Sequence, residues 1–404
     1  MDRREFLLGI AAGTTLPIVA GCRTTGTAVG GKSPSIRPPR FQPITFPGME
    51  PKPDFWKVRP NEIIEICERA KKCSRKEVIC HTPLGYPVYA LFYGDFSEPP
   101  PQSNWSAGSS SRTYRSYYGD RKDGVQTFLF LAGIHGAEQE CVAAAMNLVQ
   151  MLETGRDFRG RTDAELLKLI GQYRFIVVPC VNMDGRSISP DHLRGLNFED
   201  FRRASQGYWK DGSLIGWRGS KCWFPLPLDK VAYPGGYPNS EGFNIQHDAC
   251  PGNIRTAEAR AILQLAERWR VDAVLNGHSY EWAPSVLCPS AIALPQNVER
   301  ELDIRQRTNR ALVAAGLRAT EPQRGKAGDG FTINVPLALA CGALVLTLEC
   351  SVAYDKPIKG EMRPTRQYTF DEMMEPPFVV LREYLADGLE RPFLIRGDEK
   401  EKGD

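Results

Sequence analysis

Histidine is scarce in this chain of 404 residues, which contains only five: His81, His135, His192, His247 and His278. Acidic and basic residues nearly balance, leaving a formal net charge of +3, so binding to nucleic acid or another acidic polymer is not indicated. No two cysteines are spaced as Cys-x-x-Cys, which argues against a zinc site built from cysteines. The remaining composition, 42% hydrophobic and 25% charged, is that of a globular chain with a large core. A motif that uses two of the five histidines therefore carries unusual weight.

The N-terminus also lacks a comfortable membrane span, because its apolar stretch covers only residues 9–20. Arg3 and Arg4 precede this stretch, as paired arginines do in a twin-arginine export signal. Cys22 ends the run Val-Ala-Gly-Cys, which is similar to the processing box of a bacterial lipoprotein. We therefore expect residues 1–22 to be an export signal with Cys22 as the lipidated residue. The protein would then lie in the periplasm or cell envelope, held to the membrane by its lipid alone; an ordinary cleaved signal or a short buried helix is the alternative.

The rest of the chain divides by composition. Residues 23–54 are rich in Pro, Ser, Thr and Gly and lack periodicity, which predicts a tether. Residues 55–395 alternate strand and helix signals and are expected to form one globular domain, which a charged tail follows at residues 396–404. Within the domain, residues 97–124 and 186–242 are long enough to be insertions, and their aromatic content favours loops that shape a substrate site.

Apolar runs and helical spacing alternate along this domain. Strands are expected at residues 86–93, 127–131, 173–178, 272–275 and 343–349, and helices at residues 138–152, 256–269 and 298–315. This alternation of buried strands and helices predicts an α/β fold, a three-layer α/β/α sandwich with a mixed, mostly parallel central sheet. Ligands bind beyond the carboxyl ends of the strands in such sheets. His135, His278 and Glu349 all lie at expected strand ends.

His135 and Glu138 lie three residues apart between an expected strand and an expected helix, and they begin a candidate metal site. An imidazole and a carboxylate this close can bind one Zn²⁺, and His278 completes three protein ligands with a fourth position open for water. Bound zinc lowers the pKa of that water towards ~7, and Glu349 would act as the general base. Glu140 is a rival of Glu138 as ligand. The alternative without metal is a helix-start carboxylate beside a histidine of the core.

These residues resemble the zinc carboxypeptidase family, the carboxypeptidase A-like metallopeptidases, in order from residue 82 to residue 349. Residues 82–91 look like the family's opening strand, and residues 133–138 look like its first metal motif. Residues 178–185 resemble its Asn-Pro-Asp-Gly turn, with Met183 in place of Pro. Residues 242–248 resemble its Gly-Val-Asp-Leu-Asn-Arg-Asn segment, and residues 256–261 resemble the helix start that follows. The resemblance implies a zinc carboxypeptidase-like fold with one zinc ion per chain, bound by His135, Glu138 and His278. It also implies Glu349 as the catalytic general base.

The sequence departs from the family where the substrate's C-terminal carboxylate is bound. The candidate substrate-binding residues are Gln246, His247 and Asn244. Gln246 and His247 stand where the family has an Asn-Arg pair that binds this carboxylate, and the planar fork of Arg suits a carboxylate better than an imidazole does. Asn244 replaces the Asp that orients the first ligand histidine, so it can accept the hydrogen bond from His135 but adds no charge. The resemblance also implies an oxyanion-stabilising Arg after the Asn-Pro-Asp-Gly turn, for which Arg194 is the candidate and Arg186, Arg202, Arg203 and Arg218 are rivals. A surface role for Arg194 is the alternative.

These features favour a zinc-dependent hydrolase of peptide bonds, carboxypeptidase-like, exported and lipid-anchored, which acts on a peptide or a small amide. The altered carboxylate site favours unusual substrates such as cell-wall peptides, modified termini or side-chain amides. A zinc-dependent deacylase of small N-acyl or cell-wall compounds is the alternative among enzymes. A non-catalytic binding protein that keeps the fold is the alternative outside them, and no nucleic-acid partner is expected.

Overall fold

The computed structural model describes residues 34–97, 106, 110, 124–250, 252–280, 284–287, 295–317, 319, 332–352 and 367–393. The expected export signal at residues 1–22, with Cys22, and the tail at residues 396–404 lie outside the described residues, as does most of the predicted insertion at residues 97–124. The chain from Ile36 onward forms one unit.

The described residues build a central sheet of seven strands in the order β1-β2-β4-β3-β7-β9-β8. The strands are β1 (Arg75–His81), β2 (Pro87–Tyr93), β3 (Thr127–Ala132), β4 (Arg174–Val178), β7 (Ala273–Tyr280), β8 (Ser285–Leu287) and β9 (Leu344–Ser351). The four central strands, β4, β3, β7 and β9, run parallel, whereas the pairs towards both edges are antiparallel. The expected α/β fold with a mixed sheet is thus confirmed.

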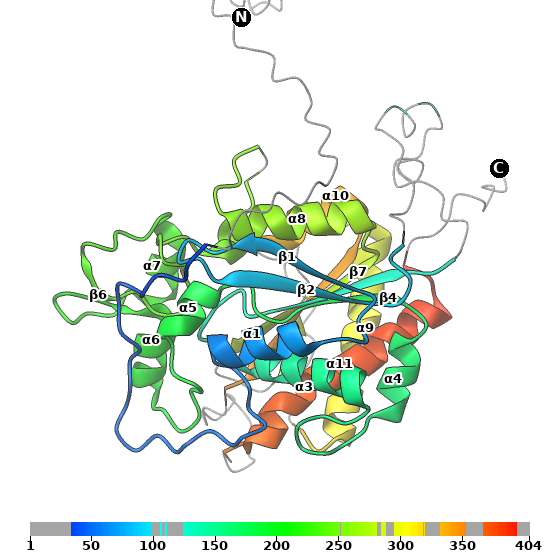
Figure 1. The fold of residues 1–404 in the computed structure, drawn as a ribbon, viewed down its shortest axis with the longest axis horizontal. Coiled ribbons are helices and arrows are strands. Elements are labelled where there is room, and N and C mark those ends of the chain that lie inside the picture. The colour runs from blue at the N-terminus through cyan, green and yellow to red at the C-terminus, as the bar shows by residue number, and fades with distance from the viewer. Residues whose placement is uncertain are drawn as a thin grey trace, which may run out of the picture. The chain divides into compact units, whose positions relative to one another are not determined.

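Helices cover both faces of the sheet (Figure 1). One face packs against α1 (Pro60–Arg69), α3 (Glu140–Thr154), α4 (Ala164–Ile170), α9 (Pro295–Ala314) and α11 (Phe370–Glu390), and the other against α8 (Ala257–Trp269) and α10 (Asn334–Cys341). Side chains of β3 alternate between the two cores, as strand geometry requires: Phe128 and Phe130 enter the first, and Leu129 and Leu131 the second. All four are fully buried, so β3 lies at the centre of the sandwich.

The predicted insertion at residues 186–242 contains secondary structure of its own and lies to the left of the sheet in Figure 1. From the turn before it to the segment after it, the elements are α5 (Met183–Ile188), α6 (Phe198–Gln206), β5 (Tyr208–Trp209), α7 (Gly216–Cys222), β6 (Val231–Tyr233) and the 3₁₀ helix η2 (Ile245–His247). Ile215, Leu226 and Val231 form a small core within it. The insertion is therefore a folded lobe that leads the chain back to the sheet.

Residues 36–54 pack on the folded domain, mainly on α5 and the insertion, although they belong to the stretch that composition predicts as a tether. The backbone N–H of Ile44 donates to the carbonyl of Ile188 at 3.3 Å, and Phe46 packs against a buried apolar cluster. These contacts hold the segment because they bury apolar side chains that a free tether would leave in water. None of the helices in the described part of the chain combines the length and the apolar character that crossing a bilayer requires.

Candidate metal centre

Two glycines bring the site's loops close to the sheet. Gly133 follows β3 with φ of +63°, and a Cβ there would lie 2.8 Å from the sulfur of Cys180. Gly277 in β7 leaves room for the first turn of α3, since a Cβ there would lie 2.6 Å from the sulfur of Cys141. Larger residues would force the chain after β3 away from β7, which carries the second histidine of the candidate site.

The structure brings His135, Glu138 and His278 together, and all three are buried. The Nδ1 atom of His135 lies 2.8 Å from Oε1 of Glu138, and the Nδ1 atom of His278 lies 2.8 Å from Oε2 of the same carboxylate. The two Nδ1 atoms are 3.3 Å apart. One ligand atom from each residue thus faces a common point, and these atoms all lie within 4.8 Å of one another.

Asn244 accounts for the orientation of the first imidazole. Its Oδ1 lies 3.1 Å from Nε2 of His135, so a neutral ring that carries its proton on Nε2 donates to the amide and turns the Nδ1 lone pair towards Glu138. Asn244 therefore orients the imidazole of His135 through Nε2, the nitrogen on the side away from Glu138. The sequence predicts this role for the residue that stands in place of the family's Asp. Because the amide is uncharged, it gives the ring orientation without the charge assistance of a carboxylate.

The electrostatics of this cluster favour a positive charge at its centre. Burial alone would raise the pKa of Glu138, but the charges and hydrogen bonds of the two imidazoles outweigh it and hold that pKa at about 2. Burial would also lower the pKa of His278, and here the charge and hydrogen bond of Glu138, together with the charge of Glu349, outweigh it and raise that pKa. The cluster thus stabilises its carboxylate and attracts a proton or another cation.

The donor set fits a divalent metal ion. Two imidazole nitrogens and a carboxylate are ligands that zinc prefers, and three protein ligands leave a coordination position open. Among the described residues, no lysine or arginine contacts His135, Glu138 or His278, so no side-chain cation already fills this role. Neutral imidazoles and a carboxylate are all acceptors at the common point, and such a set is stable only around a cation or a shared proton.

Glu349 lies beside this cluster. It is the register partner of His278 in the parallel pair β7–β9, and its side chain is half-buried. Residues in register on neighbouring strands point to the same face of a sheet, which places the carboxylate next to the second imidazole. The influence of Glu349 on the pKa of His278 agrees with this placement.

Glu140, the rival of Glu138, does not join the cluster. Its carboxylate accepts a hydrogen bond from the hydroxyl of Ser279, and burial raises its pKa to about 7. The backbone N–H of Ser279 in turn donates to Oε2 of Glu138 at 3.2 Å. Two residues after Glu138 the chain has entered α3, so Glu140 points away from the common point of the ligand atoms.

Gln246, predicted to bind substrate, is held by neutral amides. Its Oε1 accepts from Nδ2 of Asn276 at 3.1 Å, and the same Nδ2 donates to Oδ1 of Asn334 at 2.9 Å. Asn334 donates in turn to the hydroxyl of Thr347 at 2.8 Å. Asn276 and Thr347 precede His278 and Glu349 by two residues on their strands, so this amide cluster lies one pleat below them on the same face. His247 follows Gln246 at the end of η2 and is half-buried.

Arg194, predicted to stabilise an oxyanion, is engaged elsewhere. Its Nε donates to the carbonyl of Tyr368 at 2.5 Å, its guanidinium pairs with Glu50, and it lies 5.5 Å from the ring centre of Phe370. The structure thus places this side chain at the start of α11 and does not bring it to the metal cluster.

Arg186, one of its rivals, supports the metal loop from inside. It is 2% exposed and donates to the backbone carbonyls of Gly136 and Ser189, each at 2.7 Å. Burial lowers its pKa. Since its Nη atoms are occupied by backbone oxygens, Arg186 holds the loop around His135 in place.

Tyr237 is a neighbour of the site that no motif in the sequence indicates. Its ring stacks on the imidazole of His135, with ring centres 4.1 Å apart and planes inclined by 17°. Tyr237 lies in the Pro- and Gly-rich run that leads from β6 to η2, at the end of the predicted insertion. The run itself was visible as a turn signal, but no local pattern could show which residue it would meet.

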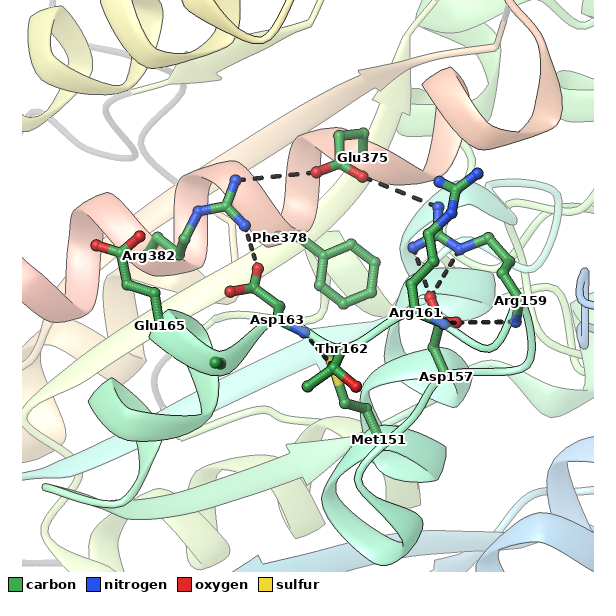
Figure 2. Close-up of a pocket in the computed structure, with 11 residues that line it drawn as sticks. Met151, Asp157, Arg159, Arg161, Thr162, Asp163, Glu165, Glu375, Phe378 and Arg382 are labelled. Atoms are coloured by element: carbon green, nitrogen blue, oxygen red, sulfur yellow. Dashed lines mark hydrogen bonds and ion pairs between the residues drawn. The ribbon is translucent and has the colours of Figure 1, made fainter.

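A cavity of about 560 Å³ lies at the far end of α3 (Figure 2). Arg159, Arg161 and Arg382 project into it together with several carboxylates. Arg159 pairs with Asp157 at 2.7 Å, and Arg382 pairs with Asp163. Each of the three guanidinium groups that line the cavity forms an ion pair with a neighbouring carboxylate. The described side chains of the cavity therefore do not form a set of hydrogen-bond donors directed at a common ligand position.

Comparison with known proteins agrees with the fold. The model of a family described as zinc carboxypeptidase matches residues 63–222, a range that includes His135 and Glu138 and ends before His278. The metallo-carboxypeptidase from Pseudomonas aeruginosa in complex with (2-guanidinoethylmercapto)succinic acid is similar in structure, with a TM-score of 0.50, 15% sequence identity, and coverage of 82% of this chain and 68% of that chain. The metallo-carboxypeptidase from Burkholderia cenocepacia has a TM-score of 0.49 at 15% identity, with coverage of 80% and 67%. At 15% identity the likeness to the Pseudomonas aeruginosa protein concerns the fold alone. No curated protein sequence matches this chain.

Proposed function

We propose that this chain, whose residues 63–222 match the model of a family described as zinc carboxypeptidase, is a zinc-dependent hydrolase of peptide or other amide bonds. The observation that carries the proposal is the convergence of the Nδ1 atoms of His135 and His278 on the carboxylate of Glu138. Glu349 on the neighbouring strand supplies the second element that hydrolysis needs, a carboxylate beside the metal position.

In the proposed mechanism His135, Glu138 and His278 hold the metal. Bound zinc supplies a Lewis acid that lowers the pKa of a water molecule towards ~7 and polarises the scissile carbonyl. Glu349 accepts the proton of the attacking water and passes it to the leaving amine, as a half-buried carboxylate near the metal position is suited to do. Asn244 keeps the Nε2 proton of His135 on the side away from the metal.

The proposed substrate is atypical for a carboxypeptidase. Gln246 and His247 occupy the positions of the family's carboxylate-binding pair, and Gln246 is bonded to the uncharged Asn276. A neutral amide environment favours an uncharged group over a free carboxylate next to the scissile bond. Cell-wall peptides, modified termini and side-chain amides are the proposed substrates, and a deacylase of small N-acyl compounds is the second candidate that the same amide cluster favours.

Arg194 stays a proposal as the oxyanion-stabilising residue. Its present partners, Glu50 and the Tyr368 carbonyl, would have to release it for that role. Export through the signal at residues 1–22 and anchoring through a lipid on Cys22 are proposed from the sequence alone.

A product analysis tests the function. Zinc-loaded protein lacking residues 1–30 is incubated with a pool of free-ended, amidated and cell-wall peptides, with E349Q as control, and the products are identified by mass spectrometry. Cleavage of blocked or side-chain-linked members that E349Q does not perform is the expected result. Loss of single C-terminal residues from free-ended members would instead show an ordinary carboxypeptidase. If the wild-type chain cleaves no member of the pool although it binds zinc, the hydrolase proposal fails.

A further inference from the structure

The return segment of the insertion, residues 234–239, lies directly against the metal loop. Tyr237 in this segment places its ring parallel to the imidazole of His135, at a centre-to-centre distance of 4.1 Å. Tyr237 is only 9% exposed, so its ring lies against protein and not in solvent. The hydrogen bond from Nε2 of His135 to Asn244 lies in the plane of the imidazole, so it does not prevent the ring from tilting. Tyr237 contacts the face of the ring and can oppose this tilt.

Backbone contacts fix the position of this segment. The N–H of Gly136 donates to the carbonyl of Gly236 at 2.7 Å, and Nδ2 of Asn182 donates to the carbonyl of Tyr237 at 3.1 Å. A Cβ at Gly236 would lie 2.5 Å from the Cβ and the backbone nitrogen of Ala137, so only glycine permits the approach. The segment is thus held against the metal loop at Gly236 and against the start of α5 at the carbonyl of Tyr237.

The neighbouring glycine shows the same close packing. Gly235 adopts φ of +75°, and a Cβ there would lie 2.5 Å from the carbonyl of Ser205 at the end of α6. Gly236 donates its own N–H to the same carbonyl at 3.1 Å. Because the backbone is held at α6 and at the metal loop, the place of the Tyr237 ring is set by the fold and does not depend on the ring's own attraction to His135.

An imidazole ligand has two side-chain torsions to fix, and the two neighbours of His135 restrain different ones. The hydrogen bond to Asn244 sets the direction of Nε2 and hence of Nδ1, but it permits the ring to tilt about that axis. A flat ring stacked at an inclination of 17° opposes this tilt. The restraint matters more here than it would beside a carboxylate, because the amide of Asn244 gives a weaker, uncharged hydrogen bond.

We propose that Tyr237 is a positioning residue of the metal centre, whose ring face holds the plane of the His135 imidazole in the orientation that binds the metal. The inference rests on the proposed role of His135 as a ligand. The inference gives the insertion a role in metal binding, because the segment that carries Tyr237 belongs to the insertion and contacts the imidazole of His135.

A competing explanation is that Tyr237 only fills space. The two explanations differ in what a planar ring without the hydroxyl achieves. Phe keeps the stacked face, whereas Leu and Met keep apolar volume and lose the planar face. Tyr208 offers a matched control, because it lies in the same insertion, packs near Tyr233 and Arg203, and does not contact His135.

The experiment measures the zinc affinity of the wild-type chain, Y237F, Y237L, Y237M and Y208L by competition with a chromophoric chelator, and the melting temperature of each variant in excess chelator. We expect Y237L and Y237M to bind zinc about 10-fold more weakly or worse, as loss of a ligand's supporting contact does elsewhere. Y237F and Y208L should stay within about 2-fold of wild type, since both leave a flat ring on His135. Y237M serves if Y237L does not fold.

Three results would overturn the assignment: equal zinc affinity in Y237L, Y237M and wild type; a Y237F affinity as low as that of Y237L; or an equal loss in Y208L. No substrate enters these measurements, so failure to find a hydrolysed peptide would affect the proposed function and leave this inference standing. A wild-type chain that binds no zinc would instead refute the ligand role of His135, and both proposals with it.

Discussion

The two ends of α3 carry buried charged groups that are arranged in opposite ways. Glu138, just before the helix, faces two imidazoles whose Nδ1 atoms point at it, and no lysine or arginine among the described residues joins them. Near the last turn, Asp157 faces the guanidinium of Arg159 at 2.7 Å in the cavity of Figure 2. One end is a set of acceptors that requires a cation, and the other is a set of charges that already neutralise each other.

The difference separates a binding site from a structural clasp, although both are buried and polar. Opposite charges in contact satisfy each other and tie the loop after α3 to α11, through pairs such as Arg382 with Asp163. Convergent lone pairs gain nothing from each other, and they persist only where an ion or a proton completes them. A cluster of titratable residues or a large cavity is therefore a weak sign of function unless its members share the same polarity.

Removal of a proposed ligand should have the largest effect. H278A takes one of three donors from the cluster, and zinc affinity should fall by more than roughly 100-fold, beyond the loss that supporting contacts alone produce. Hydrolysis should fall to background. Equilibrium dialysis against zinc measures the affinity. R159A, at the far end of α3, is the control and should keep the zinc affinity of the wild type. If H278A binds zinc as tightly as wild type, the ligand set is wrong.

Removal of the proposed general base should separate binding from chemistry. E349Q keeps the shape of the side chain beside His278 but cannot accept a proton, so turnover should fall about 10²- to 10⁴-fold. Zinc content, measured by elemental analysis, should not change. Q246A offers a comparison near the same site, and it should alter the affinity for substrate more than the rate of turnover. Unchanged turnover in E349Q would exclude Glu349 as the base.

The clasp should respond in stability alone. D157A removes one carboxylate partner of Arg159, which keeps its ion pair with Asp371 at 3.0 Å, and also removes the acceptor of the backbone N–H of Arg161, so the free energy of unfolding should fall by about 2 kcal/mol. Urea denaturation of the metal-free chain measures it. R161A, whose side chain is 60% exposed, should cost less than about 1 kcal/mol. A change in zinc affinity in D157A would contradict the separation of the two ends.

The smallest effect should be the dependence of the metal-free chain on pH. The pKa of His278 is raised in the fold, so its stabilising contribution is complete below the unfolded value of ~6.5 and is lost as pH rises through the folded value. The pKa of Glu138 is lowered to about 2, so its contribution is present above the unfolded value of ~4.3 and is lost only as pH falls towards 2. Between pH 6 and pH 9 the melting temperature of the metal-free chain should therefore fall.

Zinc should remove most of this dependence, because the metal takes the place of the proton, and zinc affinity should rise over the same range. Differential scanning calorimetry with and without chelator gives both curves. E140Q is the control, since burial raises the pKa of Glu140 to about 7 and that group gives a fall of the same sign. A metal-free E140Q chain whose melting temperature is flat from pH 6 to pH 9 would argue against a shared proton in the cluster.

Much of the sandwich was predictable from local pattern. Strands β2, β3, β4, β7 and β9 coincide with apolar runs, and helices α3, α8 and α9 have apolar residues at helical spacing. Both patterns arise because the buried faces of these elements require apolar side chains. The edge strand β1 was missed because all of its side chains are exposed or half-buried, which leaves no apolar run. Helix α11 was missed because it contains Pro376 and Pro377, and the capping box of Thr369 and Glu372 was the local sign of its start.

The sequence alone indicates that His135, His278 and Glu349 lie near the carboxyl ends of three buried strands, because apolar runs are local features and parallel strands align their carboxyl ends. In the structure His135 follows β3, whereas β7 and β9 continue for two residues beyond His278 and Glu349. The neighbours that surround these residues follow from the three-dimensional packing of the chain. This packing turned Glu140 towards Ser279, engaged Arg194 beside α11, and laid Tyr237 on the imidazole of His135. These outcomes depend on contacts between segments far apart in the chain, which follow from the packing of loops and glycine backbones, and no periodicity or spacing records them.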